Sequence, residues 1–115
     1  MSCFAAGPKP GASRGTFVNP LYEGADPWIV RQEGFYYLCK SDFAHSISVW
    51  KSERLTDRGE RKEVWKPPQS GWNTSGVWAP ELHFLQGRWY IYYAADQGHN
   101  ASHRMGVLQS KSDDP

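Results

Sequence analysis

Two segments of the sequence contain residue types that could act on a neutral, hydroxyl-bearing ligand. In the first segment, Asp26 stands directly before Pro27, which favours extended backbone and removes one hydrogen-bond donor, so its carboxylate lies at the start of a strand. A carboxylate in that place can take a proton from an attacking water molecule. Aspartate before proline also often bonds backbone amides inside a turn, and these residues alone favour that structural role.

The second segment contains Trp78, Glu81 and His83. An indole can stack on the apolar face of a sugar ring, while a carboxylate or an imidazole can bond to the hydroxyls at its edge. The alternatives are that Trp78 belongs to the core, that Glu81 bonds backbone amides and that His83 is an ordinary strand histidine. On these residues alone we expect such structural roles for Glu81 and His83.

The composition favours a neutral partner. Aromatic residues make up 15% of the chain, with six Trp and six Tyr, and the net charge is only +1. This charge gives no electrostatic reason to expect binding to nucleic acid or to an anionic membrane. Carbohydrate suits an aromatic-rich, neutral chain, although a tryptophan-rich β core has the same composition.

The cysteines and the first residues bear on whether the chain has a zinc site, a disulfide scaffold or a secretory signal. Cys3 and Cys39 form no Cys-x-x-Cys motif and no zinc-ligand spacing, so we expect free thiols without a metal site or a disulfide scaffold. The first residues lack the basic start and apolar run of a secretory signal. Localisation stays open between export and the cytoplasm.

Short aromatic and β-branched runs predict an all-β fold. Residues 1–15 are rich in Gly, Pro, Ala and Ser, which indicates a flexible leader, so the fold is expected to start near Thr16. Helix is expected at most as a turn over 53–57. The predicted strands, separated by turn residues, cover 27–30, 35–39, 47–51, 81–85, 89–94 and 105–109.

The chain repeats itself at a shift of about 53 residues. This shift superposes Pro27 on Pro80 and Gly34 on Gly87, and it also aligns the apolar positions around them. Each unit resembles one blade of a β-propeller, and two blades cannot close a ring. We therefore expect the natural protein to continue beyond Pro115 or to assemble with copies of itself. A two-sheet β-sandwich with coincidental self-similarity is the alternative.

Several motifs occur along the chain in a fixed order and spacing. They are Asn19-Pro20 with Gly24-Ala25-Asp26-Pro27-Trp28-Ile29, Phe35-Tyr36-Tyr37, Trp78-Ala79-Pro80-Glu81-Leu82-His83 and Gly87-Arg88-Trp89-Tyr90-Ile91-Tyr92-Tyr93-Ala94. Together they resemble glycoside hydrolase family 43. Ala94-Ala95-Asp96 with His103-Arg104-Met105 resembles its exo-acting α-L-arabinofuranosidases. The resemblance implies a five-bladed β-propeller, of which residues 16–115 form the first two blades of a partial catalytic domain.

The resemblance also implies an inverting mechanism with three carboxylates in the axial channel. Asp26 matches the general base, whereas the second aspartate and the glutamate acid come from later blades, before which this sequence ends. Glu81 does not replace that acid. Trp78 is expected to contact the terminal sugar, Glu81 belongs to the segment that lines the sugar pocket, and Phe43 and His45 are weaker candidates for its rim, where an ordinary exposed loop is the alternative.

The expected function is removal of terminal α-L-arabinofuranosyl groups from arabinan or arabinoxylan, with this fragment inactive alone. A β-xylosidase and an endo-arabinanase are alternatives on the same scaffold, and a fructan-acting relative fits less well. A non-catalytic carbohydrate-binding fragment is the alternative of another class. Some members of the family hold calcium near the channel, but its surroundings come from other blades, so no cofactor or metal is assigned.

Overall fold

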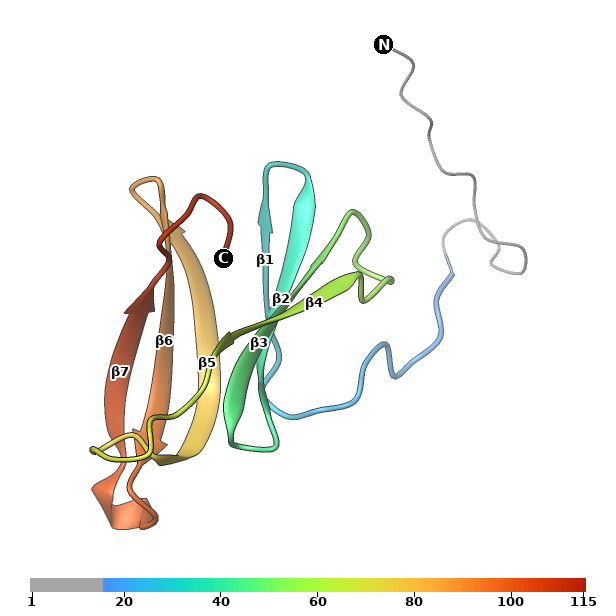
Figure 1. The fold of residues 1–115 in the computed structure, drawn as a ribbon. Coiled ribbons are helices and arrows are strands. Elements are labelled where there is room, and N and C mark those ends of the chain that lie inside the picture. The colour runs from blue at the N-terminus through green and yellow to red at the C-terminus, as the bar shows by residue number, and fades with distance from the viewer. Residues whose placement is uncertain (1–15) are drawn as a thin grey trace.

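The computed structural model describes residues 16–115, so the leader predicted for residues 1–15 lies outside the described residues. The described chain is all-β, as expected. Its elements follow the order β1 (Trp28–Gln32), β2 (Phe35–Asp42), β3 (Ser46–Ser52), β4 (Glu60–Trp65), β5 (Ser75–Leu85), β6 (Arg88–Asp96), the short 3₁₀ helix η1 (Asn100–Ser102) and β7 (Arg104–Gln109). Figure 1 shows them as two sheets standing side by side.

Both sheets are antiparallel meanders. The first has the strand order β1-β2-β3-β4 and the second has the order β5-β6-β7. Strand β5, at the edge of the second sheet, packs against β1, β2 and β3 of the first. This arrangement fits the first two blades of a partial propeller.

The hairpin turns confirm the internal repeat at the level of the backbone. Glu33 and Gly34 join β1 to β2 with φ angles of 50° and 87°. Gln86 and Gly87 join β5 to β6 with φ angles of 52° and 78°. Two consecutive residues at positive φ are typical of the type I′ turn, whose twist matches that of the two strands. The sequence shift therefore superposes equivalent turns.

The core lies between the two sheets. Ile47 from the first sheet and Val77 and Leu82 from the second are fully buried. The rings of Tyr37 and Trp89 meet across the interface with centroids 4.7 Å apart. Burying one such aliphatic side chain stabilises the fold by about 1.5–3 kcal/mol, so the interface between the sheets is a main source of stability.

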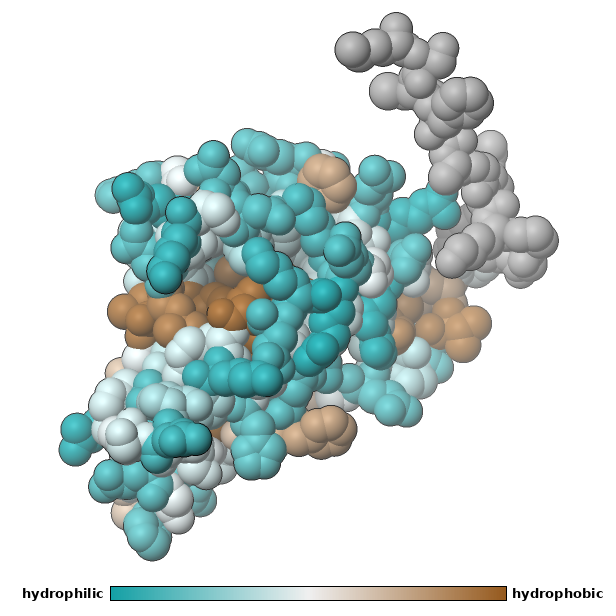
Figure 2. All heavy atoms as spheres, in the orientation of Figure 1, coloured by the Kyte–Doolittle hydropathy of each residue, from teal (hydrophilic) through white to brown (hydrophobic). Residues whose placement is uncertain are grey.

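The outer face of the second sheet carries exposed apolar residues. Met105 is 70% exposed and Val107 is 55% exposed, while Leu108 on the opposite face of β7 packs against the core. Figure 2 shows a hydrophobic band, in brown, on the side of the molecule where β6 and β7 lie. Both faces of this sheet are therefore partly apolar, as in a sheet that packs on two sides.

The strand predictions were wrong in two places. Strand β4 was missed because Glu60-Arg61-Lys62-Glu63 hides the apolar pattern, and charged side chains are common on edge strands. Strand β5 begins at Ser75, not at Glu81, because register shifts on both sides of Trp78 let it pass Gly76 and Pro80.

One helical feature was missed. The turn expected over 53–57 is present among bends, but the 3₁₀ helix at Asn100–Ser102 was not predicted. Within residues 16–115, no helix is long and apolar enough to cross a membrane.

Candidate active site

The candidate residues lie at one end of the two sheets. Strands β1 and β5 both begin at this end, and the β2–β3 turn and the β6–β7 connection with η1 also lie there (Figure 1). The two first strands are joined directly, because the Trp28 indole nitrogen donates a hydrogen bond of 2.8 Å to the Leu82 carbonyl. Trp28 is thus a link between the two sheets that was not expected.

Asp26 lies two residues before β1 in a left-handed conformation with φ of 47°. Its side chain is exposed, and its carboxylate forms no hydrogen bond or ion pair with any residue of the described part of the chain. It therefore does not bond turn amides, which was the structural alternative. In the second sheet Ala79 takes the equivalent place before Pro80, with φ of 45°.

Trp78 lies on β5 and is 43% exposed. One face of its indole stacks on the imidazole of His103, with ring centroids 4.0 Å apart and an angle of 29° between the planes. Trp78 is therefore not a core residue. A half-exposed indole that is fixed on one side leaves ring surface for contact with a ligand.

Glu81 and His83 form a side-chain pair further along β5. The Glu81 carboxylate lies 3.3 Å from His83 Nε2, and the His83 ring packs against Trp28 with centroids 5.1 Å apart. Tyr92 of β6 meets the same imidazole edge to face. Glu81 therefore bonds a neighbouring side chain, whereas the structural alternative expected it to bond backbone amides.

Phe43 and His45 belong to the turn between β2 and β3. Phe43 is 94% exposed, and both Phe43 and Ala44 have positive φ angles, of 51° and 60°. The Ala44 carbonyl accepts a hydrogen bond of 3.0 Å from the Val77 amide, so this turn of the first sheet is attached to β5 next to Trp78. The structure thus brings the predicted rim loop to the strand that carries Trp78.

Two residues at this end received no role from the sequence. Asp96, which is 4% exposed, lies with Oδ2 3.1 Å from His103 Nδ1, and its Oδ1 accepts a 2.8 Å hydrogen bond from the Gly98 amide. His103 Nε2 lies 3.0 Å from the Gly76 carbonyl. The contacts join the β6–β7 connection to the start of β5. In the sequence, only the family resemblance had singled out Asp96 and His103. Their contact could not be expected from the residues, because it depends on the path of the β6–β7 connection.

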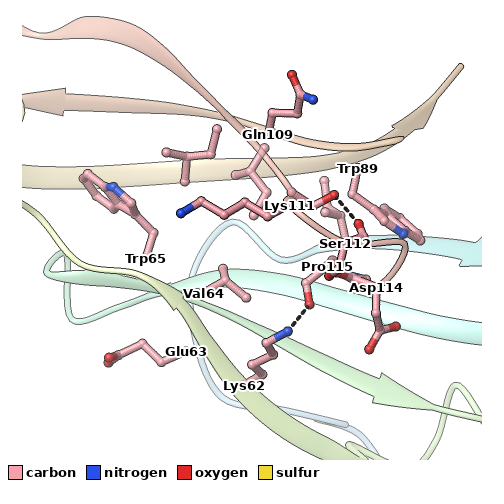
Figure 3. A pocket seen from close by; sticks show the side chains of 14 residues that line it. Lys62, Glu63, Val64, Trp65, Trp89, Gln109, Lys111, Ser112, Asp114 and Pro115 are labelled. Carbon is pink, nitrogen blue, oxygen red and sulfur yellow. Dashed lines mark hydrogen bonds between the residues drawn. The ribbon is translucent and has the colours of Figure 1, made fainter. Parts of the chain in front are cut away.

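A cavity lies elsewhere in the described part of the chain. It has a volume of about 530 Å³ and lies between the sheets, lined mainly by β4, by β6 and β7, and by the segment after β7 (Figure 3). Lys62 and Trp65 contribute side chains from β4, and Lys62 Nζ bonds the Pro115 carbonyl at 3.0 Å. None of the expected site residues lines this cavity. Within residues 16–115, no group of three or more His, Cys, Asp or Glu side chains could hold a metal ion.

Comparison with known proteins identifies similar chains. A model of the family described as glycosyl hydrolases family 43 matches residues 17–114. The extracellular exo-alpha-(1->5)-L-arabinofuranosidase of Streptomyces avermitilis is 34% identical over 112 residues, which cover 92% of this chain and 23% of that protein. The protein of the same name from Streptomyces chartreusis is 30% identical over 96% of this chain and 34% of its own length. The chain thus spans about a quarter to a third of these relatives.

Solved structures agree with these matches. The α-L-arabinofuranosidase from Lactobacillus brevis superposes with a TM-score of 0.79 at 30% identity, over 86% of this chain and 34% of that one. A thermostable family-43 glycoside hydrolase superposes with a TM-score of 0.62 at 26% identity, over 85% of this chain and 33% of that one.

Proposed function

This chain belongs to glycosyl hydrolase family 43, and on that premise we propose that it supplies the catalytic base of an enzyme that removes terminal α-L-arabinofuranosyl groups from arabinan or arabinoxylan. The observation that carries the proposal is the Asp26 carboxylate, which is exposed and unpartnered among the described residues, two positions before β1 begins. The exo-arabinofuranosidase names of the Streptomyces relatives support the choice of substrate.

In the proposed mechanism Asp26 acts on water. The carboxylate takes a proton from a water molecule while the water oxygen bonds to the anomeric carbon and the glycosidic bond breaks. A carboxylic acid from another part of the protein gives its proton to the leaving oxygen, so charge and protons balance. Attack from the face opposite the leaving group inverts the configuration at the anomeric carbon.

The surrounding residues provide contacts for the sugar in this proposal. Trp78 offers the free face of its indole to the terminal arabinofuranosyl ring. Phe43 and His45 form the rim from the first sheet, and Glu81 lies on the same strand as Trp78 as a hydrogen-bonding group. Residues 16–115 contain the base but not the acid, so the proposed activity belongs to the full-length protein.

The test is replacement of Asp26 by Ala in the full-length protein, assayed with p-nitrophenyl α-L-arabinofuranoside. Loss of a general base is expected to lower kcat by about 10²- to 10⁴-fold, while KM changes little because the carboxylate acts on water. Glu23→Ala is the matched control, since Glu23 is an exposed carboxylate three positions earlier in the chain. A kcat for Asp26→Ala equal to that of the control would refute the assignment of the base.

Two further readouts test the finer parts of the proposal. Proton NMR of the first product formed shows whether the anomeric configuration is inverted, and retention would exclude water activation by Asp26 in a single displacement. Parallel assays with p-nitrophenyl β-D-xylopyranoside and linear arabinan separate the exo-arabinofuranosidase from a β-xylosidase and an endo-arabinanase. A protein that binds these sugars without turnover is the non-catalytic alternative.

A further inference from the structure

The β6–β7 connection returns across the end of the second sheet and supports Trp78 from behind. His103, the last residue before β7, stacks on the indole with centroids 4.0 Å apart. Trp78 is still 43% exposed in this arrangement. The imidazole therefore covers one face of the indole, and the remaining surface is free for a ligand.

Both nitrogens of the His103 ring face oxygen atoms of neighbouring residues. Nδ1 lies 3.1 Å from Asp96 Oδ2 and 3.2 Å from the Asn100 carbonyl, and Nε2 lies 3.0 Å from the Gly76 carbonyl. Whichever nitrogen carries the proton, it has an oxygen acceptor within hydrogen-bond distance. A hydrogen bond donated by either nitrogen therefore fixes the ring beneath Trp78.

Asp96 is the buried anchor of this arrangement. It is 4% exposed, and a buried carboxylate is strongly unfavourable unless its oxygens are hydrogen-bonded. One carboxylate oxygen accepts a hydrogen bond of 2.8 Å from the Gly98 amide, and the other oxygen faces the His103 ring. Gly76 lies against the same carboxylate, because a Cβ atom at this position would be 2.6 Å from Asp96 Oδ2. Asp96, His103 and Gly76 therefore form one packed unit under Trp78.

We propose that His103, anchored by Asp96 and the Gly76 carbonyl, is a positioning residue that fixes the Trp78 indole for stacking on the sugar ring of the substrate. The inference rests on the proposed function, in which Trp78 contacts that sugar. It adds a role for His103 and Asp96, which touch neither the substrate nor the reacting atoms. Fixing the indole before binding lowers the entropy lost when substrate binds, so the pair acts on affinity.

The experiment compares His103→Ala with wild type in the full-length protein, using p-nitrophenyl α-L-arabinofuranoside. Loss of one aromatic stacking contact is expected to raise KM about two- to tenfold, with kcat within about twofold of wild type. A merely structural role would lower the amount of folded enzyme, and so the apparent kcat, without changing KM. His99→Ala is the matched control, because His99 is an exposed histidine of the same connection whose side chain forms none of these contacts.

A second variant tests the anchoring. His103→Phe keeps a ring beneath Trp78 but removes both nitrogen contacts, so KM is expected to lie between wild type and His103→Ala. A wild-type KM for His103→Phe would overturn the anchoring role of Asp96 and Gly76. This variant also decides the proposal if His103→Ala does not fold.

Trp78→Ala separates the failure of this inference from the failure of the proposed function. If Trp78→Ala leaves KM unchanged, the sugar contact of Trp78 is wrong and the proposed site falls. If Trp78→Ala raises KM but both His103 variants keep the wild-type KM, the sugar contact stands and the positioning role alone is overturned. A rise in KM for both residues supports the full proposal.

Discussion

Replacement of Gly76 by Ala tests the packed unit at the start of β5. Gly76 has a φ of +57°, and an added Cβ would lie 2.6 Å from Asp96 Oδ2 and 2.8 Å from the Asp96 carboxyl carbon. Real Cβ atoms do not come this close to a carboxylate, so Asp96 must move. Movement of Asp96 also disturbs its hydrogen bonds with Gly98 and His103.

The expected loss of stability has two parts. The left-handed backbone costs about 1–2 kcal/mol for Ala compared with Gly. Displacement of the buried carboxylate adds about 1.5–3 kcal/mol, which is the contribution of a hydrogen bond to a charged group. We therefore expect Gly76→Ala to be destabilised by about 2.5–5 kcal/mol.

Gly87→Ala is the matched control for this substitution. Gly87 lies in the same sheet with a φ of +78°, but nothing lies within 4 Å of an added Cβ, so only the backbone part of the loss applies. Urea unfolding of the wild type and both variants, followed by tryptophan fluorescence, gives the difference between them. If Gly76→Ala is no less stable than Gly87→Ala, the contact with Asp96 contributes nothing and the reasoning is refuted.

Two further predictions concern the first sheet. Burial raises the pKa of Asp42, but hydrogen bonds from Ser48 and Arg61 and the charges of Arg61 and Lys40 outweigh burial, so its pKa lies below the ordinary value. The resulting stabilisation is complete above the unfolded pKa of about 4 and is lost as pH falls through the lower folded pKa. The stability difference between wild type and Asp42→Asn should therefore shrink as pH falls below about 4, and a difference that stays constant over this fall would contradict the prediction. Burial also raises the pKa of the Cys39 thiol to about 12, so peptide mapping after iodoacetamide treatment at neutral pH should find Cys39 unlabelled in the folded protein and labelled in urea; labelling of the folded protein would contradict its burial.

The general fold could be predicted because its signals are local. The Glu33-Gly34 and Gln86-Gly87 turns and the aromatic strands after them repeat at one spacing, and each turn needs residues that accept positive φ. Cys39 was expected to be a free thiol, and it is free and buried. Cys3 lies outside the described residues. These features depend on neighbours along the chain, which a sequence displays directly.

The missed features depend on contacts between distant segments. Strand β4 is charged along most of its length, and its pairing with β3 is visible only in the folded sheet. His103 and Gly76 are 27 positions apart, and they meet only because the β6–β7 connection turns back over β5. The role of Trp28 as a link between sheets has the same origin, since Trp28 and Leu82 are 54 positions apart.

The internal repeat allows the backbone conformation of Asp26 to be compared with that of its equivalent in the second sheet, Ala79. A left-handed conformation in a non-glycine residue often marks a functional site, and Asp26 has a φ of 47°. Ala79, in the equivalent place before Pro80, has a φ of 45° without any group that could do chemistry. The conformation therefore belongs to the residue before the repeated proline, Pro27 or Pro80, and at this place only the unpartnered carboxylate of Asp26 distinguishes the first sheet from the second. Because the second sheet accepts Ala at this place, Asp26→Ala should fold like the wild type, and its loss of turnover would report on chemistry alone.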